Sequence, residues 1–364
     1  MKSDYKTFKF TLRTMAPVHI GSGEKYTSRE FIYENDSFYF PDMGKFYASM
    51  VAKGLDRKFE AFLMEHGKRA VNNRLVSFTY DNRIKDRNFG GYKIKESDYE
   101  NDKSSLGTLN EISKIVRDGF GQPYIPGSSL KGAICTILLN SHPEWKEANF
   151  ATGRKGKEKE DKTVVPWGAK PGKDFDDLFN EIRVSDSQSL KINGIDFKNE
   201  DIILVQKLDK SSKESGDKLR ALPLYREALP PFTVAEFTIT TTTERAASMM
   251  RSLGQLSFDF YKSYKEFFLN DFSEKYIQDN VQYPIYLGAG SGAWTKTIFK
   301  QANGILQKRY DRLKTKMIGK GVLKLTRAKN KSFLVKGQER KLVKNNENLY
   351  EMGKANFIIQ EVKV

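Results

Sequence analysis

Apolar and polar residues alternate along several short stretches of this chain, as they do in β-strands that bury one face. The alternation is clearest near the N-terminus, where Phe8, Phe10 and Leu12 are separated by Lys9 and Thr11. Similar stretches, bounded by turn-forming residues, predict further strands. The predicted strands lie at residues 182–186, 202–207, 222–227, 232–242 and 357–364, with a hairpin formed by residues 30–33 and 37–40.

Other stretches repeat their apolar residues at the three- to four-residue spacing of a helix. The best of them, residues 244–268, predicts an amphipathic helix. An earlier helix is predicted to begin with Asp42 as its N-cap and to continue to about Met64. Residues 130–139 predict a buried helix, and residues 298–313 predict one more near the C-terminal end.

Strands that return at long range between helices predict an α+β fold. A ferredoxin-like βαββαβ arrangement fits this order of elements without being required by it. Two polar segments predict an insertion with little core of its own at about 66–118 and a flexible charged loop at 146–178. The predicted regions are therefore 1–145, 146–178 and 179–364, and the pattern leaves open whether the last forms a second ferredoxin-like unit.

Charge narrows the class of partner. The chain has 62 Lys and Arg residues against 46 Asp and Glu, a net charge of +16, which favours nucleic acid or an anionic surface over the alternative of an unused basic face. Its one cysteine, Cys135, excludes an intramolecular disulfide and a thiolate metal cluster. Residues 1–6 lack the apolar core of a signal peptide, and no run of about 18 apolar residues offers a membrane span, so we expect a cytoplasmic protein with no membrane partner.

Three glycine-rich segments that carry basic residues lie far apart in the sequence. Glycine lets backbone N–H groups approach a phosphate closely, and a nearby lysine adds positive charge. Because three such segments occur in one basic chain, they predict contact with the phosphate backbone of a nucleic acid. The predicted contact residues are His19, Gly21, Ser22, Gly23 and Lys25 in the first segment, Gly127, Ser128, Ser129 and Lys131 in the second, and Gly288, Gly290, Ser291, Gly292, Trp294 and Lys296 in the third.

The order and separation of these segments resemble those of the RAMP proteins of CRISPR systems. Residues 16–23, 123–134 and 287–292 match the opening, central and C-terminal motifs of that superfamily. The length of the chain, the run 226–229 before a proline pair, and the run 350–353 are most similar to one RAMP subunit of the type III-A (Csm) effector complex. Many relatives carry arginine where Ile134 or Cys135 stands, so any RNA contact made by that arginine is absent or remade here.

The resemblance implies an RRM-like RAMP core and a place at the 3′ end of a guide RNA, with a part in guide-RNA maturation. It adds Arg226 to the predicted RNA-binding residues. The implied partners are the guide RNA (crRNA), other Csm subunits, the repeated backbone RAMP subunit above all, and recruited cellular nucleases.

The resemblance also raises a catalytic role, because some RAMP relatives are metal-independent endoribonucleases. His19 could act as a general acid or base, but RNA cleavage also needs a second group and charge stabilisation, and His66 and His142 lie in segments without a motif. The alternative is a histidine at a strand end that bonds backbone or stacks on a base. No catalytic residue is therefore predicted, with His19 as the runner-up.

Metal-dependent cleavage would need clustered carboxylates. Asp42, Asp186 and Glu227 each lie at a strand or loop end, and Asp42 is explained by its role as a helix cap. No metal site and no cofactor are predicted.

Three further features each allow two interpretations. Lys131 follows two serines at a helix N-terminus that favours an anion, but its glycines could serve helix packing and leave it solvated. Trp294 could stack on a base or lie in the core. The basic run from Lys314 to Lys331 is interpreted as a solvated face in preference to the alternative, contact with RNA.

Taken together, these observations predict an RNA-binding subunit without a catalytic centre of its own. Two alternatives come from other classes: an endoribonuclease that acts on guide-RNA precursor through His19 or a carboxylate set, and a scaffold that recruits a separate nuclease.

Overall fold

The structure is a computed structural model. It describes residues 5–35, 37–65, 74–85, 88–95, 111–146, 164–165, 173–212, 216, 218–278, 281–296, 298–299 and 321–362.

A seven-stranded sheet, here called the central sheet, joins the two ends of the chain. Its strand order is β10-β9-β13-β1-β20-β14, with β8 also paired to β13. The first strand lies between β13 and β20 and is antiparallel to both, with Phe10 opposite Phe237 on one side and Ile359 on the other. The strands are β1 (Lys6–Thr14), β8 (Ile182–Val184), β9 (Lys191–Ile192), β10 (Ile195–Asp196), β13 (Thr233–Thr241), β14 (Pro284–Tyr286) and β20 (Lys354–Val362).

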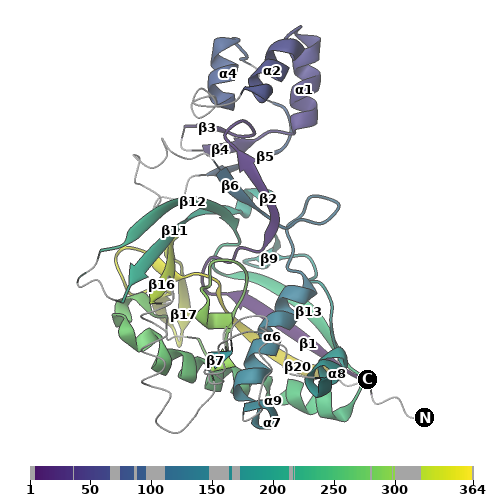
Figure 1. Cartoon of the computed structure of the whole chain (residues 1–364), viewed down its shortest axis with the longest axis vertical. Coiled ribbons are helices and arrows are strands. Elements are labelled where there is room, and N and C mark those ends of the chain that lie inside the picture. The colour runs from purple at the N-terminus through teal and green to yellow at the C-terminus, as the bar shows by residue number, and fades with distance from the viewer. Residues whose placement is uncertain are drawn as a thin grey trace, which may run out of the picture.

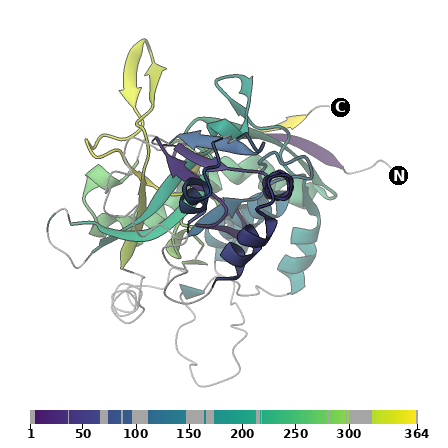
Figure 2. The same ribbon diagram turned by 90° about the horizontal axis from the view of Figure 1, so that it is seen from above.

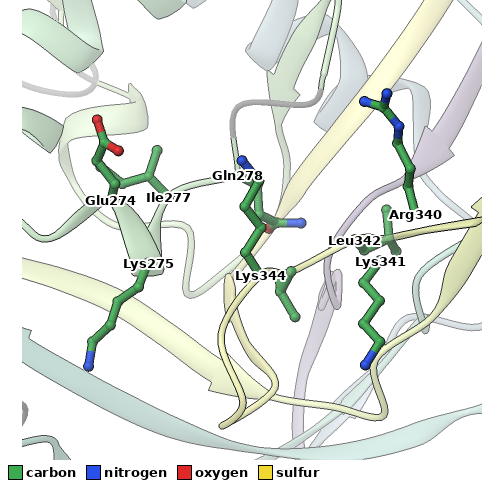
Figure 3. A pocket seen from close by; sticks show the side chains of 9 residues that line it. Glu274, Lys275, Ile277, Gln278, Arg340, Lys341, Leu342 and Lys344 are labelled. Carbon is green, nitrogen blue, oxygen red and sulfur yellow. The ribbon is translucent and has the colours of Figure 1, made fainter.

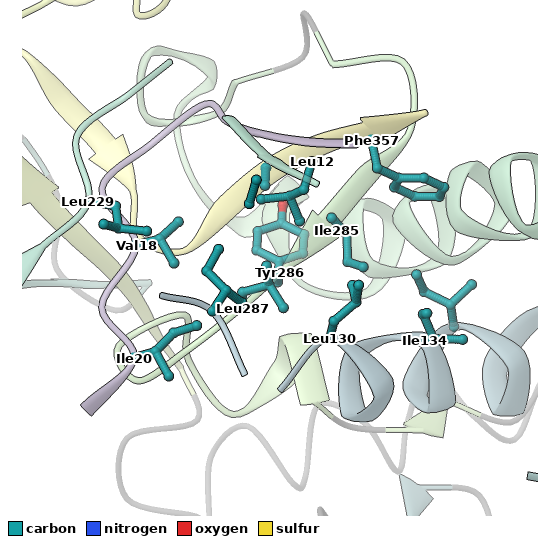
Figure 4. Packing of buried hydrophobic residues seen from close by; sticks show 14 of the residues in the cluster. Leu12, Val18, Ile20, Leu130, Ile134, Leu229, Ile285, Tyr286, Leu287 and Phe357 are labelled. Carbon is teal, nitrogen blue, oxygen red and sulfur yellow. The ribbon is translucent and has the colours of Figure 1, made fainter. Parts of the chain in front are cut away.

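Two long helices cover one face of the central sheet. The helix α6 (Gly127–Ser141) comes between β1 and β8 along the chain, and α9 (Glu244–Phe267) comes between β13 and β20. Figure 1 shows α6 in front of β1, β13 and β20, with α9 beside the lower end of α6. Their apolar stripes meet the sheet in the main core, where Leu130 and Ile134 of α6 lie near Leu12 and Phe357 (Figure 4).

A six-stranded sheet, here called the second sheet, has the order β19-β16-β11-β12-β6-β2. Its strands come from both ends of the chain, and β12 and β6 run parallel while the other pairs are antiparallel. The C-terminal half therefore supplies strands to both sheets, and it is not a self-contained second unit. The strands are β2 (Gly21–Thr27), β6 (Glu111–Ile115), β11 (Ile203–Ser211), β12 (Arg220–Ala228), β16 (Val322–Arg327) and β19 (Leu349–Glu351).

A small helical unit stands at the top of Figure 1, over a three-stranded sheet of order β3-β4-β5. It has its own apolar cluster, and Leu75 and Phe78 belong to it, so the segment predicted as an insertion with little core does contribute core residues. The helix predicted to run to Met64 is two helices, because Gly54 adopts φ +65° between them. The elements are β3 (Ile32–Glu34), β4 (Ser37–Phe40), β5 (Tyr92–Lys95), α1 (Met43–Ala52), α2 (Asp56–Met64) and α4 (Leu75–Asp81).

The remaining elements are short. A hairpin of β17 and β18 projects from the body, in yellow in Figure 2. The helix predicted at 298–313 is wrong at its start, where β15 pairs with β7, and the rest of that prediction lies outside the described residues. These elements are α7 (Pro143–Lys146), α8 (Lys173–Asn180), β7 (Val164–Val165), β15 (Ile298–Phe299), β17 (Ser332–Val335), β18 (Gln338–Lys341), η1 (Asn199–Asp201), η2 (Leu269–Asp271), η3 (Glu274–Tyr276) and η4 (Trp294–Lys296).

The middle of the central sheet depends on one aromatic residue. Phe10 is fully buried, stacks on Phe357 at 4.8 Å and meets Phe237 edge-on at 6.1 Å. We expect Phe10→Ala to lower the free energy of unfolding by about 3–5 kcal/mol, because it removes these contacts and leaves a cavity. Urea unfolding measures the loss. The matched control is Phe120→Ala, whose ring is 93% exposed and whose removal should change stability by less than about 0.5 kcal/mol. Equal effects of the two substitutions would contradict this account.

Candidate nucleic-acid interface

The first and third glycine-rich segments lie against each other. The amide of Ala289 donates to the carbonyl of His19 at 2.8 Å. Gly288 adopts φ +75°, and a Cβ added there would lie 2.1 Å from the same carbonyl oxygen. Glycine at position 288 is therefore required both for the backbone conformation and for the close approach.

His19 is buried at this junction and only 2% exposed. Its Nδ1 lies 2.6 Å from the carbonyl oxygen of Glu227, and because that oxygen can only accept, Nδ1 carries the proton and donates. Burial lowers the pKa of His19 to about 4. The ring is therefore neutral at pH 7 and donates to the backbone. This matches the interpretation of His19 as a histidine at a strand end that bonds backbone.

The first segment is a strand and not the loop that its glycines predict. Gly21, Ser22 and Gly23 are exposed within β2, whose pairing with β6 is irregular between Gly21 and Lys25. The Ser22 hydroxyl accepts from the Glu24 amide at 3.2 Å, and Lys25 forms an exposed ion pair with Glu111 at 2.6 Å.

The second segment packs on the end of β8. The amide of Gly127 donates to Asp186 Oδ1 at 2.7 Å, so a carboxylate of the protein itself already lies at the N-terminus of α6. A Cβ added at Gly127 would lie 2.4 Å from the carbonyl oxygen of Ser185, which supports the packing role of this glycine. Lys131 is half-buried, and its Nζ lies 4.5 Å from the centre of the Phe179 ring.

The two serines between Gly127 and Lys131 differ in exposure. Ser128 is exposed and Ser129 is half-buried in the first turn of α6. The two positions at which relatives carry arginine also differ: Ile134 is fully buried in the main core, and Cys135 is half-buried, with its pKa raised to about 12 by burial. Position 134 therefore serves packing in this chain, and the Cys135 thiol is neutral at pH 7.

Basic side chains surround the third segment. Lys296 Nζ donates to the carbonyl of Gly288 at 2.9 Å, and Arg226 Nη1 lies 3.5 Å from the carbonyl of Ala289. A Cβ added at Gly290 would lie 2.4 Å from Arg226 Nη1, so glycine there leaves room for the guanidinium.

The other two residues predicted in this segment face inward. Trp294 is 2% exposed and lies 5.6 Å from Phe268, between ring centres, in the main core. The interpretation of Trp294 as a stacking surface for bases is therefore wrong in this conformation. Ser291 is also buried, and its hydroxyl donates to the carbonyl of Gly288 at 3.2 Å.

Two lysines that the motifs did not single out join this site from the second sheet. Lys324 Nζ lies 2.9 Å from Asp209 Oδ1, and Lys207 Nζ lies 3.9 Å from Asp209 Oδ2. The Lys324 stem also lies against Gly292, since a Cβ added at that glycine would be 3.4 Å from Lys324 Cγ. We call Lys207, Asp209, Arg226, Lys296 and Lys324 the glycine-loop cluster. Lys324 belongs to the basic run of the sequence, whereas Lys207 carried no signal except its place in a predicted strand.

Among the described residues, the cluster holds four cations close together with one carboxylate, that of Asp209, beside them. Burial lowers the pKa of Lys207, and the neighbouring charges of Lys324 and Arg226 lower it further against the opposing effect of Asp209. Burial lowers the pKa of Lys296, and the positive charge of Arg226 lowers it further. Burial also lowers the pKa of Arg226, opposed by Asp209.

The carboxylates considered for metal binding are each engaged elsewhere. Asp42 caps α1 by accepting from the amides of Gly44 and Lys45, and Asp186 holds the start of α6. Glu227 is fully buried and accepts from both terminal nitrogens of Arg117 at 2.9 and 3.0 Å. Within the described part of the chain, no group of three or more His, Cys, Asp or Glu residues could hold a metal ion.

A cavity of about 740 Å³ lies between η3 and residues 340–344. Its basic side chains are Lys275, Arg340, Lys341 and Lys344, and Figure 3 shows that Lys275, Arg340 and Lys341 do not point toward a common centre. This cavity is therefore less suited to an anionic ligand than the glycine-loop cluster.

Among the described helices, none is long and apolar enough to cross a membrane.

The sequence of this chain matches one known protein family and several of its members. The profile of the RAMP superfamily matches residues 11–293. The chain is 58% identical over 364 residues to the CRISPR system protein Csm5 of Streptococcus thermophilus, which covers all of this chain and 99% of that protein. It is 31% identical over 330 residues to Csm5 of Mycobacterium tuberculosis, with 82% of this chain and 84% of that protein covered.

Two solved structures share the fold at low sequence identity. A chain in the cryo-EM structure of a Csm–crRNA–target RNA ternary complex of a type III-A CRISPR-Cas system matches with a TM-score of 0.58 and 14% identity, covering 96% of this chain and all of that one. The crystal structure of T. onnurineus Csm5 matches with a TM-score of 0.54 and 13% identity, covering 95% and 99%.

The chain therefore belongs to the RAMP superfamily, with a mixed α+β fold. Within that superfamily its relatives are the Csm5 proteins of CRISPR systems.

The buried, neutral state of His19 has a consequence for stability. Because its pKa is lower in the folded chain than in the unfolded chain, acid favours the unfolded chain, and stability is lost as pH falls below about 6.5 toward 4. We expect the wild type to lose on the order of 2 kcal/mol between pH 7.5 and pH 5 from this group. His19→Asn, which keeps a donor for the Glu227 carbonyl and does not titrate, should lose less over the same interval. Urea unfolding at both pH values measures the difference, and parallel losses in the two proteins would contradict the account.

Proposed function

We propose that this chain is the RNA-binding subunit of a type III CRISPR Csm complex that holds the 3′ end of the guide RNA. The observation that carries the proposal is the glycine-loop cluster. Residues predicted to contact RNA in separate parts of the sequence, Arg226 and residues 288–292 with Lys296, come together there around the His19 backbone. Cations beside a glycine-rich loop are suited to a phosphate backbone.

The make-up of the cluster favours binding with little selection among bases. Lys and Arg contacts to phosphate position a nucleic acid but carry no sequence information. Trp294, the aromatic residue of the third segment, lies in the core and offers no stacking face. A subunit of a guide-RNA complex needs such tolerance, because guide RNAs differ in sequence.

The central sheet supports an RRM-like core. Along the sheet the order is β20-β1-β13-β8, with α6 following β1 and α9 following β13. We infer that this is the ferredoxin-like βαββαβ core of a RAMP protein. The names of the relatives and the solved Csm–crRNA–target RNA complex support crRNA and other Csm subunits as partners. The position at the 3′ end, the contact with the repeated backbone subunit and the part in guide-RNA maturation rest on the resemblance of the motifs.

A binding role is favoured over cleavage by the surroundings of the candidate groups. His19 is neutral and bonded to the Glu227 carbonyl, and the Glu227 carboxylate is taken up by Arg117. The scaffold alternative is compatible with RNA binding, and recruitment of a separate nuclease belongs to the proposal as a second role of the assembled subunit.

The first test is incubation of the purified chain with end-labelled guide RNA, with and without magnesium, read on native and denaturing gels. We expect a shift that weakens as salt rises, with intact RNA in both conditions. The double variant Arg226→Gln, Lys296→Gln should bind more weakly and reduce the slope of log affinity against log salt by about two.

The matched control is Lys191→Gln, which removes an exposed lysine from β9 in the central sheet and should bind as the wild type does. Discrete RNA products that disappear with His19→Asn or with a chelator would make the chain a nuclease. A native-gel shift that survives the double variant at full strength would move RNA binding away from this cluster.

A further inference from the structure

Three strands of the second sheet bring charged side chains to one face. Asp209 of β11 pairs in register with Lys324 of β16, and Val205 of β11 pairs with Arg226 of β12. The pairing of β11 with β12 is irregular between Gln206 and Leu208, where Lys207 lies. Lys207 nevertheless lies on the same side as Asp209, because its Nζ is 3.9 Å from Asp209 Oδ2. The strands lie side by side at the left of Figure 1.

Among the described residues, this face and the loop beside it carry more cations than carboxylates. Four cations, Lys207, Arg226, Lys296 and Lys324, belong to the cluster, and one carboxylate of the described residues, Asp209, faces them. Glu227, next to Arg226, points to the opposite face, where Arg117 occupies both of its oxygens.

The cations are also partly withdrawn from water. The side chains of Lys207 and Lys324 are 21% and 17% exposed, and that of Asp209 is 16% exposed. Like charges held close together in a half-buried site are unfavourable until an anion binds among them. The fold therefore holds these cations where they repel one another, and an incoming phosphate would reduce that repulsion.

We propose that the glycine-loop cluster is a phosphate site in which Asp209 stands in for an RNA phosphate until the RNA binds. Both oxygens of Asp209 face lysines, Oδ1 toward Lys324 and Oδ2 toward Lys207, as two oxygens of a phosphodiester would. The bound phosphate takes over these lysines, with Arg226 and Lys296 at the loop beside them. The choice of RNA as the source of the phosphate rests on the proposed function.

This arrangement makes stability and RNA affinity change in opposite directions. Lys207→Gln removes one of the crowded cations, so the free protein should become more stable while RNA binds more weakly. Asp209→Asn removes the carboxylate, so the free protein should become less stable while RNA binds more tightly. A purely structural ion pair would lose stability in both variants.

The experiment measures melting temperature and affinity for a single-stranded RNA oligonucleotide on the full chain, at constant ionic strength. For Lys207→Gln we expect a raised melting temperature, an affinity three- to tenfold weaker, and a salt slope smaller by about one. For Asp209→Asn we expect a lower melting temperature and an affinity three- to tenfold tighter. Lys191→Gln, with the same loss of charge on the central sheet, should change neither quantity appreciably.

A second arm replaces RNA by inorganic tripolyphosphate. It should raise the melting temperature of the wild type more than that of Lys207→Gln. If wild-type RNA binding is intact and salt-sensitive but unchanged in Lys207→Gln, the phosphate site is wrong and the proposed function stands. If RNA fails to bind the wild type while tripolyphosphate still distinguishes the two proteins, the anion site stands and RNA is the wrong source. A fall in melting temperature in both Lys207→Gln and Asp209→Asn would overturn the substitution of phosphate for Asp209.

Discussion

The segment that leaves β1, residues 15–20, holds the two sheets and the third glycine-rich segment together through its backbone. The amides of Met15 and Ala16 both donate to the carbonyl of Lys354 at 3.0 Å, and Val18 forms a bridge with Leu229 next to β12. The carbonyl of His19 then accepts from Ala289 at 2.8 Å. Backbone hydrogen bonds need no particular side chain, but they require close approach, and Gly288 permits it at the last of these contacts.

Buried ion pairs fix the geometry on either side of this segment. Lys354 and Glu351 are almost completely buried, and Glu351 also accepts from the hydroxyl of Tyr286 at 2.8 Å. Glu227 and Arg117 make the corresponding contact in the second sheet. Such pairs contribute little net stability, but each becomes strongly unfavourable if one partner is lost. They therefore favour a single arrangement of β12, β20 and the loops that these strands carry.

The cations of the glycine-loop cluster owe their positions to this fixed frame. The position of Arg226 follows from the register of β12, that of Lys324 from the register of β16 with β11, and that of Lys296 from the turn η4 behind the glycines. If the frame were loose, these charges would move apart and their mutual repulsion would fall. Held in place, they keep a high local positive potential next to a loop without bulky side chains, as phosphate recognition requires.

Local sequence determined the parts of this protein that depend on near neighbours. The alternation at Phe8, Phe10 and Leu12 specified a half-buried strand, and the spacing of apolar residues specified α9, because both patterns act within one element. The cap at Asp42 and the three glycine motifs were equally local, and the motifs sufficed to indicate the RAMP superfamily.

The tertiary structure alone decided which of the motif residues form one site. Lys207 lies in an ordinary strand by sequence, and it becomes part of the cluster because β11 pairs with β12 on one side and with β16 on the other. The pairing with β16 joins residues far apart in the chain, since Asp209 and Lys324 are 115 positions apart. Trp294 and His19 were ambiguous for the same reason, since burial is set by the elements that pack over them. A sequence reports the pattern of a strand or loop, but strand pairing and packing, which depend on the whole chain, decide what that element touches.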